Sequence, residues 1–175
     1  KSDPAKAASP PPNNFESALD LSLNICLHAA KEIEANQILD YFNIFLSPFM
    51  QNLEPEKIKS VTRLFVRNLA QHTNVSLGLE LAIPDFLAKK PAIGPNGKRM
   101  GTYSDFTEQV QQLASCLLEV LEEENERKPL TGPSPVVKIR PETLVDDRAK
   151  AMFLKAHGLA ANKGIPYFAN AAQKN

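Results

Sequence analysis

The sequence of 175 residues has little cysteine, no tryptophan and no excess of charge. Its two cysteines, Cys26 and Cys116, are too few for a disulfide framework or a four-cysteine metal site. Twenty Lys and Arg balance 20 Asp and Glu, so no long-range field attracts a phosphate backbone or an anionic bilayer. No apolar run approaches the roughly 18 residues of a membrane span, and residues 1–12 lack the apolar core of a signal peptide. We therefore expect a cytoplasmic protein in a reducing compartment that binds no nucleic acid and no membrane.

Proline marks where regular structure begins and ends. The run Pro10–Pro12 excludes helix and strand, and residues 1–13 are predicted to be a disordered tail. Residues 14–72 then carry apolar side chains at helical spacing, which predicts three helices. The first spans about 14–34, the second carries an aromatic stripe from Ile38 to Phe49, and the third begins at Pro55.

After residue 72 the apolar pattern changes to strands that alternate with helices. Large apolar and small residues alternate from Val75 to Ile83, which is the two-residue period of a strand. The elements predicted after it are a helix from Ser104, a strand Val136–Arg140, a helix Asp146–Asn162 capped by Gly164, and a strand Ile165–Asn170. N-terminal helices followed by this βαβαβ order predict an α/β fold with parallel strands. Because three strands leave two raw edges and the first residue is Lys, we expect a piece of a longer protein with an incomplete sheet.

No residue stands out as catalytic or metal-ligating. Neither Cys26 nor Cys116 has a neighbouring cation or partner cysteine that would lower its pKa, so both are predicted to be buried core thiols. The spacing of His28, His72 and His157 fits neither a metal pair nor a nucleophile motif. We expect these histidines to be surface residues or hydrogen-bonded structural ones.

Three polar features of the sequence need an explanation. The loop Gly94–Gly101, with Lys98 and Arg99, is either an anion-binding cradle for a phosphate or a plain hairpin-like loop. Glu80, a carboxylate within an apolar strand, either points to solvent or lines a polar cavity. The run Glu122–Glu126 ends a helix, where acidic side chains oppose the helix dipole, so we expect it to be solvated and frayed.

Several short motifs occur in this chain in the same order as in a known family. They are Phe45–Phe49 with the helix start Glu54–Lys59, the strand Leu77–Leu81, the segment Ile83–Phe86, the turn Gly101–Phe106 and the segment Gly164–Asn170. In these motifs the chain resembles the N-terminal part of the catalytic barrel of anaerobic ribonucleoside-triphosphate reductases, in their archaeal-like branch. The similarity covers nearly everything after the proline tail, and the Pro166-Tyr167-Phe168 strand is its most telling part.

The resemblance implies a glycyl-radical enzyme that reduces ribonucleoside triphosphates to deoxyribonucleotides inside a ten-stranded α/β barrel. Residues 73–175 would be part of that barrel, and residues 14–72 a helical segment with a dimer or effector surface. In the family a separate S-adenosylmethionine-dependent iron–sulfur activase makes the glycyl radical. The implied partners are ribonucleoside triphosphates, nucleotide effectors, the activase and a second copy of the chain. Tyr167 and Asn170, which match the strand beside the family's finger loop, are candidate substrate-binding residues together with Glu80.

The residues that carry the family's radical chemistry have no match in this sequence. The family's finger-loop cysteine follows the Pro-Tyr-Phe strand, whereas this sequence stops at Asn175, and Cys26 and Cys116 match neither radical position. A glycyl-radical segment and a C-terminal cysteine cluster for zinc are also missing. We therefore expect no catalytic residue, metal or cofactor in this chain, which would be a partial catalytic subunit that is inactive alone.

Two alternatives remain open from the sequence. One is a freestanding binding or regulatory module derived from that barrel, which forms oligomers through its helices and its open sheet edge. The other is an unrelated α/β protein whose loop Pro91–Gly101 binds an anion through Lys98 and Arg99.

Overall fold

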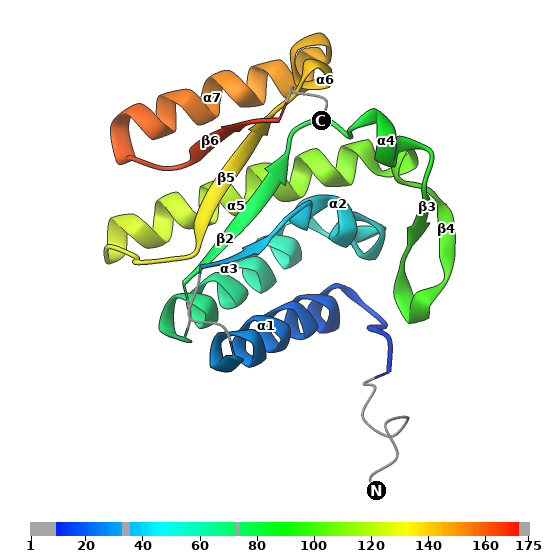
Figure 1. Ribbon diagram of the computed structural model, residues 1–175, viewed down its shortest axis with the longest axis horizontal. Coiled ribbons are helices and arrows are strands. Elements are labelled where there is room, and N and C mark those ends of the chain that lie inside the picture. Colours follow the sequence, from blue (N-terminus) through cyan, green and yellow to red (C-terminus); the bar gives the residue numbers. More distant parts are fainter. Residues whose placement is uncertain (1–9, 33–35, 73, 172–175) are drawn as a thin grey trace, which may run out of the picture.

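A parallel sheet of four strands in the order β1-β2-β5-β6 forms the centre of the computed structural model (Figure 1). The structure describes residues 10–32, 36–72 and 74–171. The strands of this sheet are β1 (Gln37–Leu39), β2 (Val75–Glu80), β5 (Ser134–Ile139) and β6 (Tyr167–Asn170). The last three are the strands predicted from the sequence, so the α/β fold with parallel pairing is confirmed.

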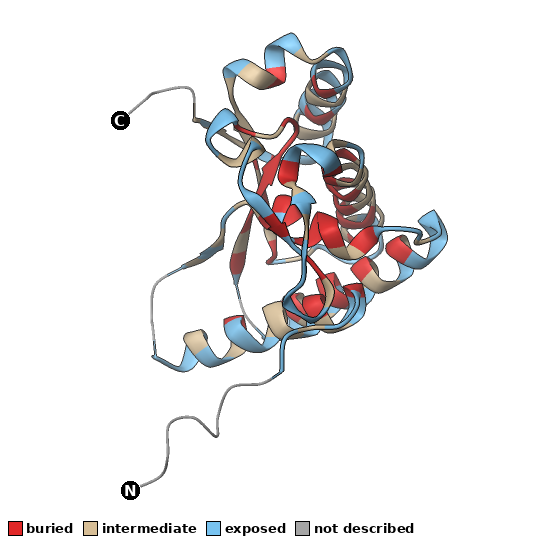
Figure 2. Cartoon of the chain, turned by 90° about the vertical axis from the view of Figure 1, so that its right-hand side faces the viewer, coloured by how far each residue is buried: buried red, intermediate tan, exposed pale blue. Residues whose placement is uncertain are grey.

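Helices connect the strands and cover one face of the sheet. The long ones are α1 (Phe15–Glu32), α3 (Pro55–His72), α5 (Thr107–Arg127) and α7 (Asp147–Lys163). The short ones are α2 (Phe42–Leu46), η2 (Ser47–Met50), α4 (Asp85–Ala88), η4 (Tyr103–Phe106) and α6 (Pro141–Val145). In Figure 1, α3 and α5 pass behind the strands and α7 runs alongside β6, and Figure 2 shows the chain from the side, with the buried residues concentrated between helices and sheet.

The two faces of the sheet differ in burial. Leu77, Leu79 and Val137 belong to the hydrophobic core under the helices and are 0% exposed. Ile38 and Tyr167, on the opposite face, are 64% and 57% exposed. We call this second face the inner face. By strand alternation and register it carries Ile38, Asp40, Ser76, Gly78, Glu80, Ser134, Val136, Lys138, Tyr167 and Ala169.

A cluster of ion pairs joins α3 to α5 on the helical side. Arg67 donates to both carboxylate oxygens of Glu124, at 2.8 and 2.9 Å, while Lys59 and Arg63 contact Glu123. Glu124 is therefore only 7% exposed. The prediction that this acidic helix end is solvated and frayed is wrong, because three cations of α3 compensate the charges that the helix dipole disfavours.

Capping residues fix both ends of α7, and the cap at Gly164 is the predicted one. The carboxylate of Asp146 accepts a hydrogen bond from the backbone N–H of Ala149 at 2.6 Å, which satisfies a donor of the first turn. At the other end Gly164 has φ 75°, the left-handed conformation that glycine adopts most readily. The chain then turns back into β6, where Phe168 stacks on His157 of α7 with ring centroids 4.0 Å apart.

The predicted second helix is wrong at its start. Gln37–Leu39 form β1, which pairs with β2, and only Phe42–Leu46 and the 3₁₀ turn Ser47–Met50 are helical. Tyr41 has φ 54° and ends the extended stretch abruptly. The segment 14–72, predicted to be helical, therefore contributes a strand to the same sheet. The predicted end of the first helix at 33–34 lies outside the described residues, as do residues 1–9 of the tail.

The loop after α4 is a small antiparallel hairpin of β3 (Pro91–Ile93) and β4 (Arg99–Thr102), joined by the turn η3 (Pro95–Gly97). Its turn contacts the N-terminal segment, because the backbone N–H of Asn96 donates to the carbonyl of Pro12 at 2.8 Å. Among the helices that the structure describes, none combines the length and the apolar character needed to cross a membrane.

Candidate functional site

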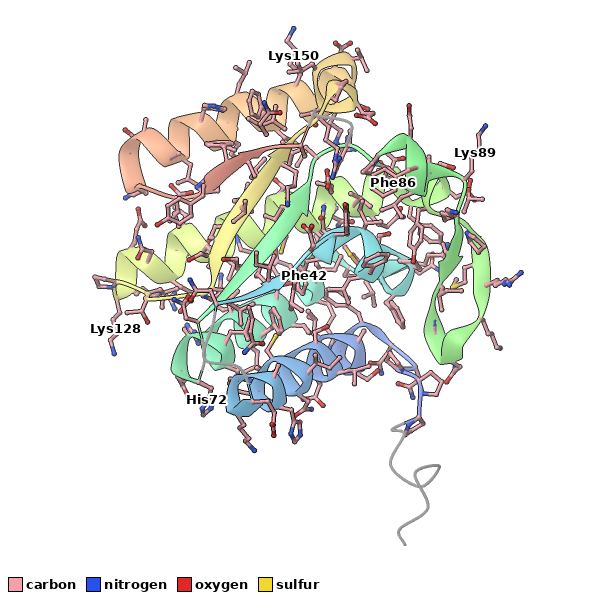
Figure 3. All side chains as sticks on the ribbon, viewed as in Figure 1. Phe42, His72, Phe86, Lys89, Lys128 and Lys150 are labelled. Carbon is pink, nitrogen blue, oxygen red and sulfur yellow. The ribbon has the colours of Figure 1, made fainter. Side chains whose placement is uncertain are left out.

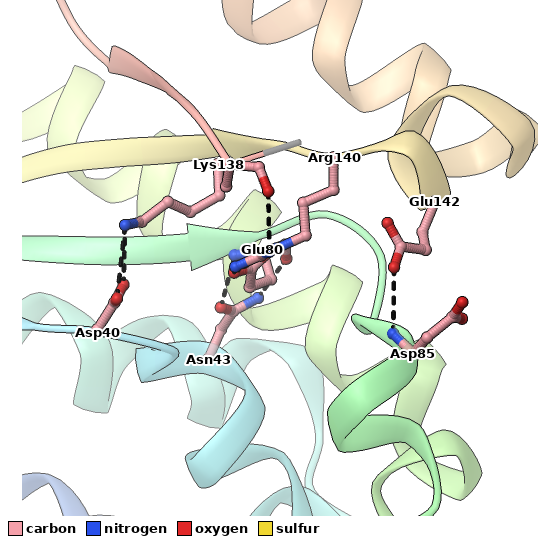
Figure 4. A network of polar contacts seen from close by, with 8 residues as sticks. Asp40, Asn43, Glu80, Asp85, Lys138, Arg140 and Glu142 are labelled. Carbon is pink, nitrogen blue, oxygen red and sulfur yellow. Dashed lines mark hydrogen bonds and ion pairs between the residues drawn. The ribbon is translucent and has the colours of Figure 1, made fainter. Parts of the chain in front are cut away.

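Charged side chains gather where the parallel strands end (Figure 4). Glu80 is the last residue of β2, Arg140 follows β5, Lys138 is near the end of β5, and Asp40 follows β1. The carboxyl ends of parallel strands in an α/β sheet share one edge, and ligands of such folds bind at this edge. Figure 3 shows Phe86 of α4 at the same edge, whereas His72 and Lys128 lie at the opposite end of the sheet. This edge and the inner face beside it form the candidate site.

Glu80 and Arg140 form a bidentate ion pair at the centre of the edge. Nε of Arg140 lies 2.8 Å from Oε2 of Glu80, and Nη2 lies 2.8 Å from Oε1. The Glu80 side chain is 0% exposed and that of Arg140 is 12% exposed. Burial raises the pKa of the Glu80 carboxyl, and the guanidinium opposes that shift, while the same hydrogen bonds raise the pKa of Arg140. The alternative in which Glu80 points to solvent is thus wrong.

Asn43 holds the end of β2 from the other side. Its Nδ2 donates to the carbonyl of Glu80 at 2.7 Å and to that of Val110 at 2.9 Å, and its Oδ1 accepts from the backbone N–H of Glu80 at 3.0 Å. Asn43 is 0% exposed. Its amide satisfies backbone groups that a buried strand end would otherwise leave unpaired.

A second ion pair lies one step along the inner face. Nζ of Lys138 is 3.2 Å from Oδ1 of Asp40, and both side chains retain contact with solvent. Gly78 makes room for this pair, because a Cβ at that position would collide with the Asp40 carboxylate and lie 3.1 Å from its Cα. The absence of a side chain at Gly78 is thus explained by the close approach of Asp40.

The predicted substrate-binding residues lie on different faces of the sheet. Tyr167 projects from the inner face beside Val136, in the same face as Glu80. Asn170 is paired in register with Ile139 and alternates with Ala169, so it belongs to the other face of β6. Phe168, between them in β6, packs against Phe153 and His157 of α7. Tyr167 and Glu80 are therefore on one face, and Asn170 is on the opposite one.

The two predicted anion-binding residues lie elsewhere. Lys98 and Arg99 are exposed on the hairpin, which is separate from the four-stranded sheet. The backbone N–H groups of Gly94, Gly97 and Lys98 donate to carbonyls within the same turn. A phosphate cradle needs such N–H groups to converge on the ligand, and here they close the hairpin instead. The hairpin-like loop is the form that the structure shows.

Neither cysteine thiol is activated as a nucleophile. Cys26 is 0% exposed in the core, and burial raises its pKa. Burial also raises the pKa of Cys116 to about 11, so its reactive thiolate is scarce at neutral pH. Cys26 is a buried core thiol, as predicted, whereas Cys116 is only partly buried and packs against the same core. Within residues 10–32, 36–72 and 74–171 no three His, Cys, Asp or Glu side chains cluster in a way that could hold a metal ion.

Sequence reasoning missed Asp40, Asn43, Lys138 and Arg140. One signal was available for the last two: Lys138 and Arg140 are two residues apart in a predicted strand, so both project to one face. An inward carboxylate on the neighbouring strand, Glu80, then calls for an inward cation. The partners of Asn43 could not be found in this way, because they are backbone groups whose position depends on the tertiary fold.

Comparison with known proteins decides the family. The family model described as anaerobic ribonucleoside-triphosphate reductase matches residues 3–175. The chain belongs to this family. No curated protein sequence matches this chain at a significant level.

Solved structures of anaerobic reductases share the fold. The anaerobic ribonucleotide reductase from Thermotoga maritima with citrate in the active site superposes with a TM-score of 0.72 at 12% identity, over 99% of this chain and 32% of that one. The same organism's enzyme in complex with dATP and CTP gives 0.70 at 14% identity, over 99% and 30%. Another structure, described as an anaerobic ribonucleotide reductase, gives 0.71 at 12% identity, over 99% and 28%. This anaerobic reductase chain thus spans about a third of the length of the structures it matches.

Proposed function

We propose that this chain forms part of the catalytic barrel of an anaerobic ribonucleotide reductase, with its inner face turned towards the ribonucleoside triphosphate. The observation that carries the proposal is the uncovered inner face of a parallel sheet in a chain of this family: the ring of Tyr167 is exposed on it, and the Lys138–Asp40 pair lies towards its carboxyl edge. Helices cover the other face, so a ligand meets the sheet from the inner side.

The inner face offers the chemistry that a ribonucleotide needs. Lys138 can leave Asp40 for a phosphate, because both side chains reach solvent, at 19% and 39% exposure, and a single ion pair of this kind contributes little. The exposed ring of Tyr167 can stack on a base or a ribose, and Ser76 and Ser134, which pair with each other in β2 and β5, belong to the same face. Asn170 belongs to the opposite face of β6, and we do not assign it to this site. Lys98 and Arg99 lie outside it.

The radical steps need groups other than the two thiols of this chain. A radical cysteine must reach the ribose, whereas Cys26 is buried in the helix-covered core and Cys116 lies on the helical side. We propose that the parent enzyme uses a glycyl radical, made by an S-adenosylmethionine-dependent iron–sulfur activase, and that residues 1–175 alone do not turn over. On this proposal the enzyme is cytoplasmic and supplies deoxyribonucleotides for DNA replication.

The helical side suits the proposed dimer and effector contacts. Ile25 of α1 and Leu64 of α3 are 54% and 61% exposed, and Leu64 lines a hollow of about 560 Å³ between these helices together with Leu23. Exposed apolar side chains beside such a hollow are typical of an interaction surface. We assign the second copy of the chain, or a nucleotide effector, to the segment 14–72.

The complete gene product tests this proposal. With its activase, under anaerobic conditions, it should convert CTP to the deoxyribonucleotide, and residues 1–175 alone should not. The reading frame should continue past Asn175 to a nearby cysteine and, much later, to a glycyl site of the Arg-x-x-Gly-Tyr kind. A frame that ends at Asn175 with neither element nearby would overturn the enzymatic function.

The edges of the sheet support a second candidate, a freestanding module that forms oligomers. Among the described strands β1 and β6 are the edges, and each carries an exposed apolar residue, Ile38 and Tyr167. Open edges pair readily with another chain. Sedimentation equilibrium should then show a stable oligomer of the 175-residue chain. A folded monomer at all concentrations would exclude the module.

A further inference from the structure

Arg140 contacts residues at the ends of all four strands of the sheet. It follows β5, and its Nε and Nη2 donate to Glu80 at the end of β2. Its Nη1 donates to the carbonyl of Ala171, just after β6, at 3.2 Å. Its Cζ lies 5.8 Å from the ring centroid of Tyr41, which follows β1. A single guanidinium thus joins the carboxyl ends of the four strands, which we call their exits and which are 30 or more residues apart in the sequence.

The charged groups of Glu80 and Arg140 are already engaged by partners within the chain. Both carboxylate oxygens of Glu80 accept from Arg140, and the rings of Tyr41 and Phe86 lie at 5.8 and 5.6 Å from the guanidinium. Arg140 is only 12% exposed and Glu80 is 0% exposed. Neither side chain is presented to a ligand on the inner face, so their influence on such a ligand passes through the segments that they hold.

Two of these segments are held in defined positions. Ala171 is fixed on both sides, because its N–H donates to the carbonyl of Ile139 at 2.9 Å while its carbonyl accepts from Arg140. Tyr41 has φ 54°, a conformation that a residue with a side chain adopts only when its surroundings enforce it. Its ring packs edge-to-face on Phe86 with centroids 5.9 Å apart.

We infer that Arg140 is a positioning residue, held in place by Glu80, that sets the exits of β1 and β6 relative to the inner face. The inference rests on the proposed function, since these exits flank the ribonucleotide site proposed above. It changes the role of Glu80 from a substrate contact to a support of Arg140. The planar fork of an arginine is essential to this role, because a lysine ammonium cannot serve Glu80 in bidentate fashion and Ala171 at the same time.

Hydrogen exchange and CTP titration of the 175-residue chain test the inference with three variants. Arg140→Lys keeps the charge and removes the fork, and Glu80→Gln is a milder change of nearly equal shape. The matched control is Arg67→Gln, which breaks a bidentate Arg–Glu pair on the helical side. The two readouts are the exchange rate of the Ala171 amide relative to that of Leu79 in the core, and the dissociation constant for CTP.

In Arg140→Lys the Ala171 amide should exchange about tenfold faster relative to Leu79, because losing a hydrogen bond from a charged donor changes the local opening equilibrium by at least roughly that factor. CTP should bind several-fold more weakly to the same variant. Glu80→Gln should change both readouts in the same direction and by less. Arg67→Gln should change neither the exchange rate of Ala171 relative to Leu79 nor the dissociation constant for CTP.

Three results would overturn the inference: an unchanged Ala171 ratio, a ratio that rises equally in the control, or faster exchange with unaltered CTP affinity. If the unmodified chain binds no CTP, the proposed function fails, and the exchange ratio still decides whether Arg140 holds the exit of β6.

Discussion

The side-chain amide of Asn43 pairs with the backbone of Glu80 in both directions, with Nδ2 donating at 2.7 Å and Oδ1 accepting at 3.0 Å. It thereby takes the place of a neighbouring strand at the end of β2. Asn43 is 0% exposed and also donates to the carbonyl of Val110. The carboxyl edge of the sheet thus depends on a short helix that follows β1, and stability and site geometry are coupled through it.

Replacing Asn43 by Ala should lower the free energy of unfolding by roughly 2–4 kcal/mol, because it leaves the buried N–H and carbonyl of Glu80 without the partner that Asn43 provides. Urea unfolding followed by circular dichroism measures this change. The control is Asn24→Ala, since Asn24 makes an exposed hydrogen bond to Asp20 and should matter by less than about 0.5 kcal/mol. Equal losses in both variants would contradict this role of Asn43.

Replacing Gly78 by Ala should destabilise the chain by about 1–3 kcal/mol, because the new Cβ collides with Asp40. The Lys138–Asp40 pair should separate as a result. Gly158→Ala is the matched control: it lies in α7 with no atom within 4 Å of the added Cβ, and should raise stability by roughly 0.5–1 kcal/mol. The two variants should therefore move the urea midpoint in opposite directions. A Gly78→Ala chain as stable as the parent would show that this face tolerates a side chain there.

Stability should fall in acid because of Glu124. Its pKa is lowered by the hydrogen bonds from Arg67, so between the lowered and the ordinary value the unfolded chain binds more protons than the folded one. The stabilisation is present above the ordinary pKa and is lost as the pH falls through the lowered one. Urea midpoints between about pH 6 and pH 3 should decline less steeply in Glu124→Gln than in the parent. Parallel profiles would mean that Glu124 is not coupled to folding.

Both thiols should resist alkylation in the folded chain. The pKa of Cys116 is about 11 and that of the buried Cys26 is also raised, so at pH 8 iodoacetamide should modify Cys116 on the order of 100-fold more slowly than in urea. Mass spectrometry over time gives both rates. Modification of Cys116 at the unfolded rate would show that the thiol is exposed or activated.

The sequence predicted those elements whose signals are local. Asp146 and Gly164 marked the ends of α7 correctly, because a cap acts within a few residues of itself. β1 was missed, because three residues are too few to show a two-residue period and Ile38 and Leu39 continue the aromatic stripe of the next helix. At the site, Glu80 was singled out as unusual, whereas its partner Arg140 is set by the register of β2 on β5. Such a register cannot be read from either strand alone.

The titration of the isotope-labelled chain with CTP, followed by NMR, tests the central claim most directly. If the inner face binds the ribonucleoside triphosphate, CTP should change the amide chemical shifts of Ser76, Lys138 and Tyr167. Inorganic triphosphate should change mainly that of Lys138. Shifts confined to Lys98 and Arg99 on the hairpin, or no shifts at millimolar CTP, would contradict the claim.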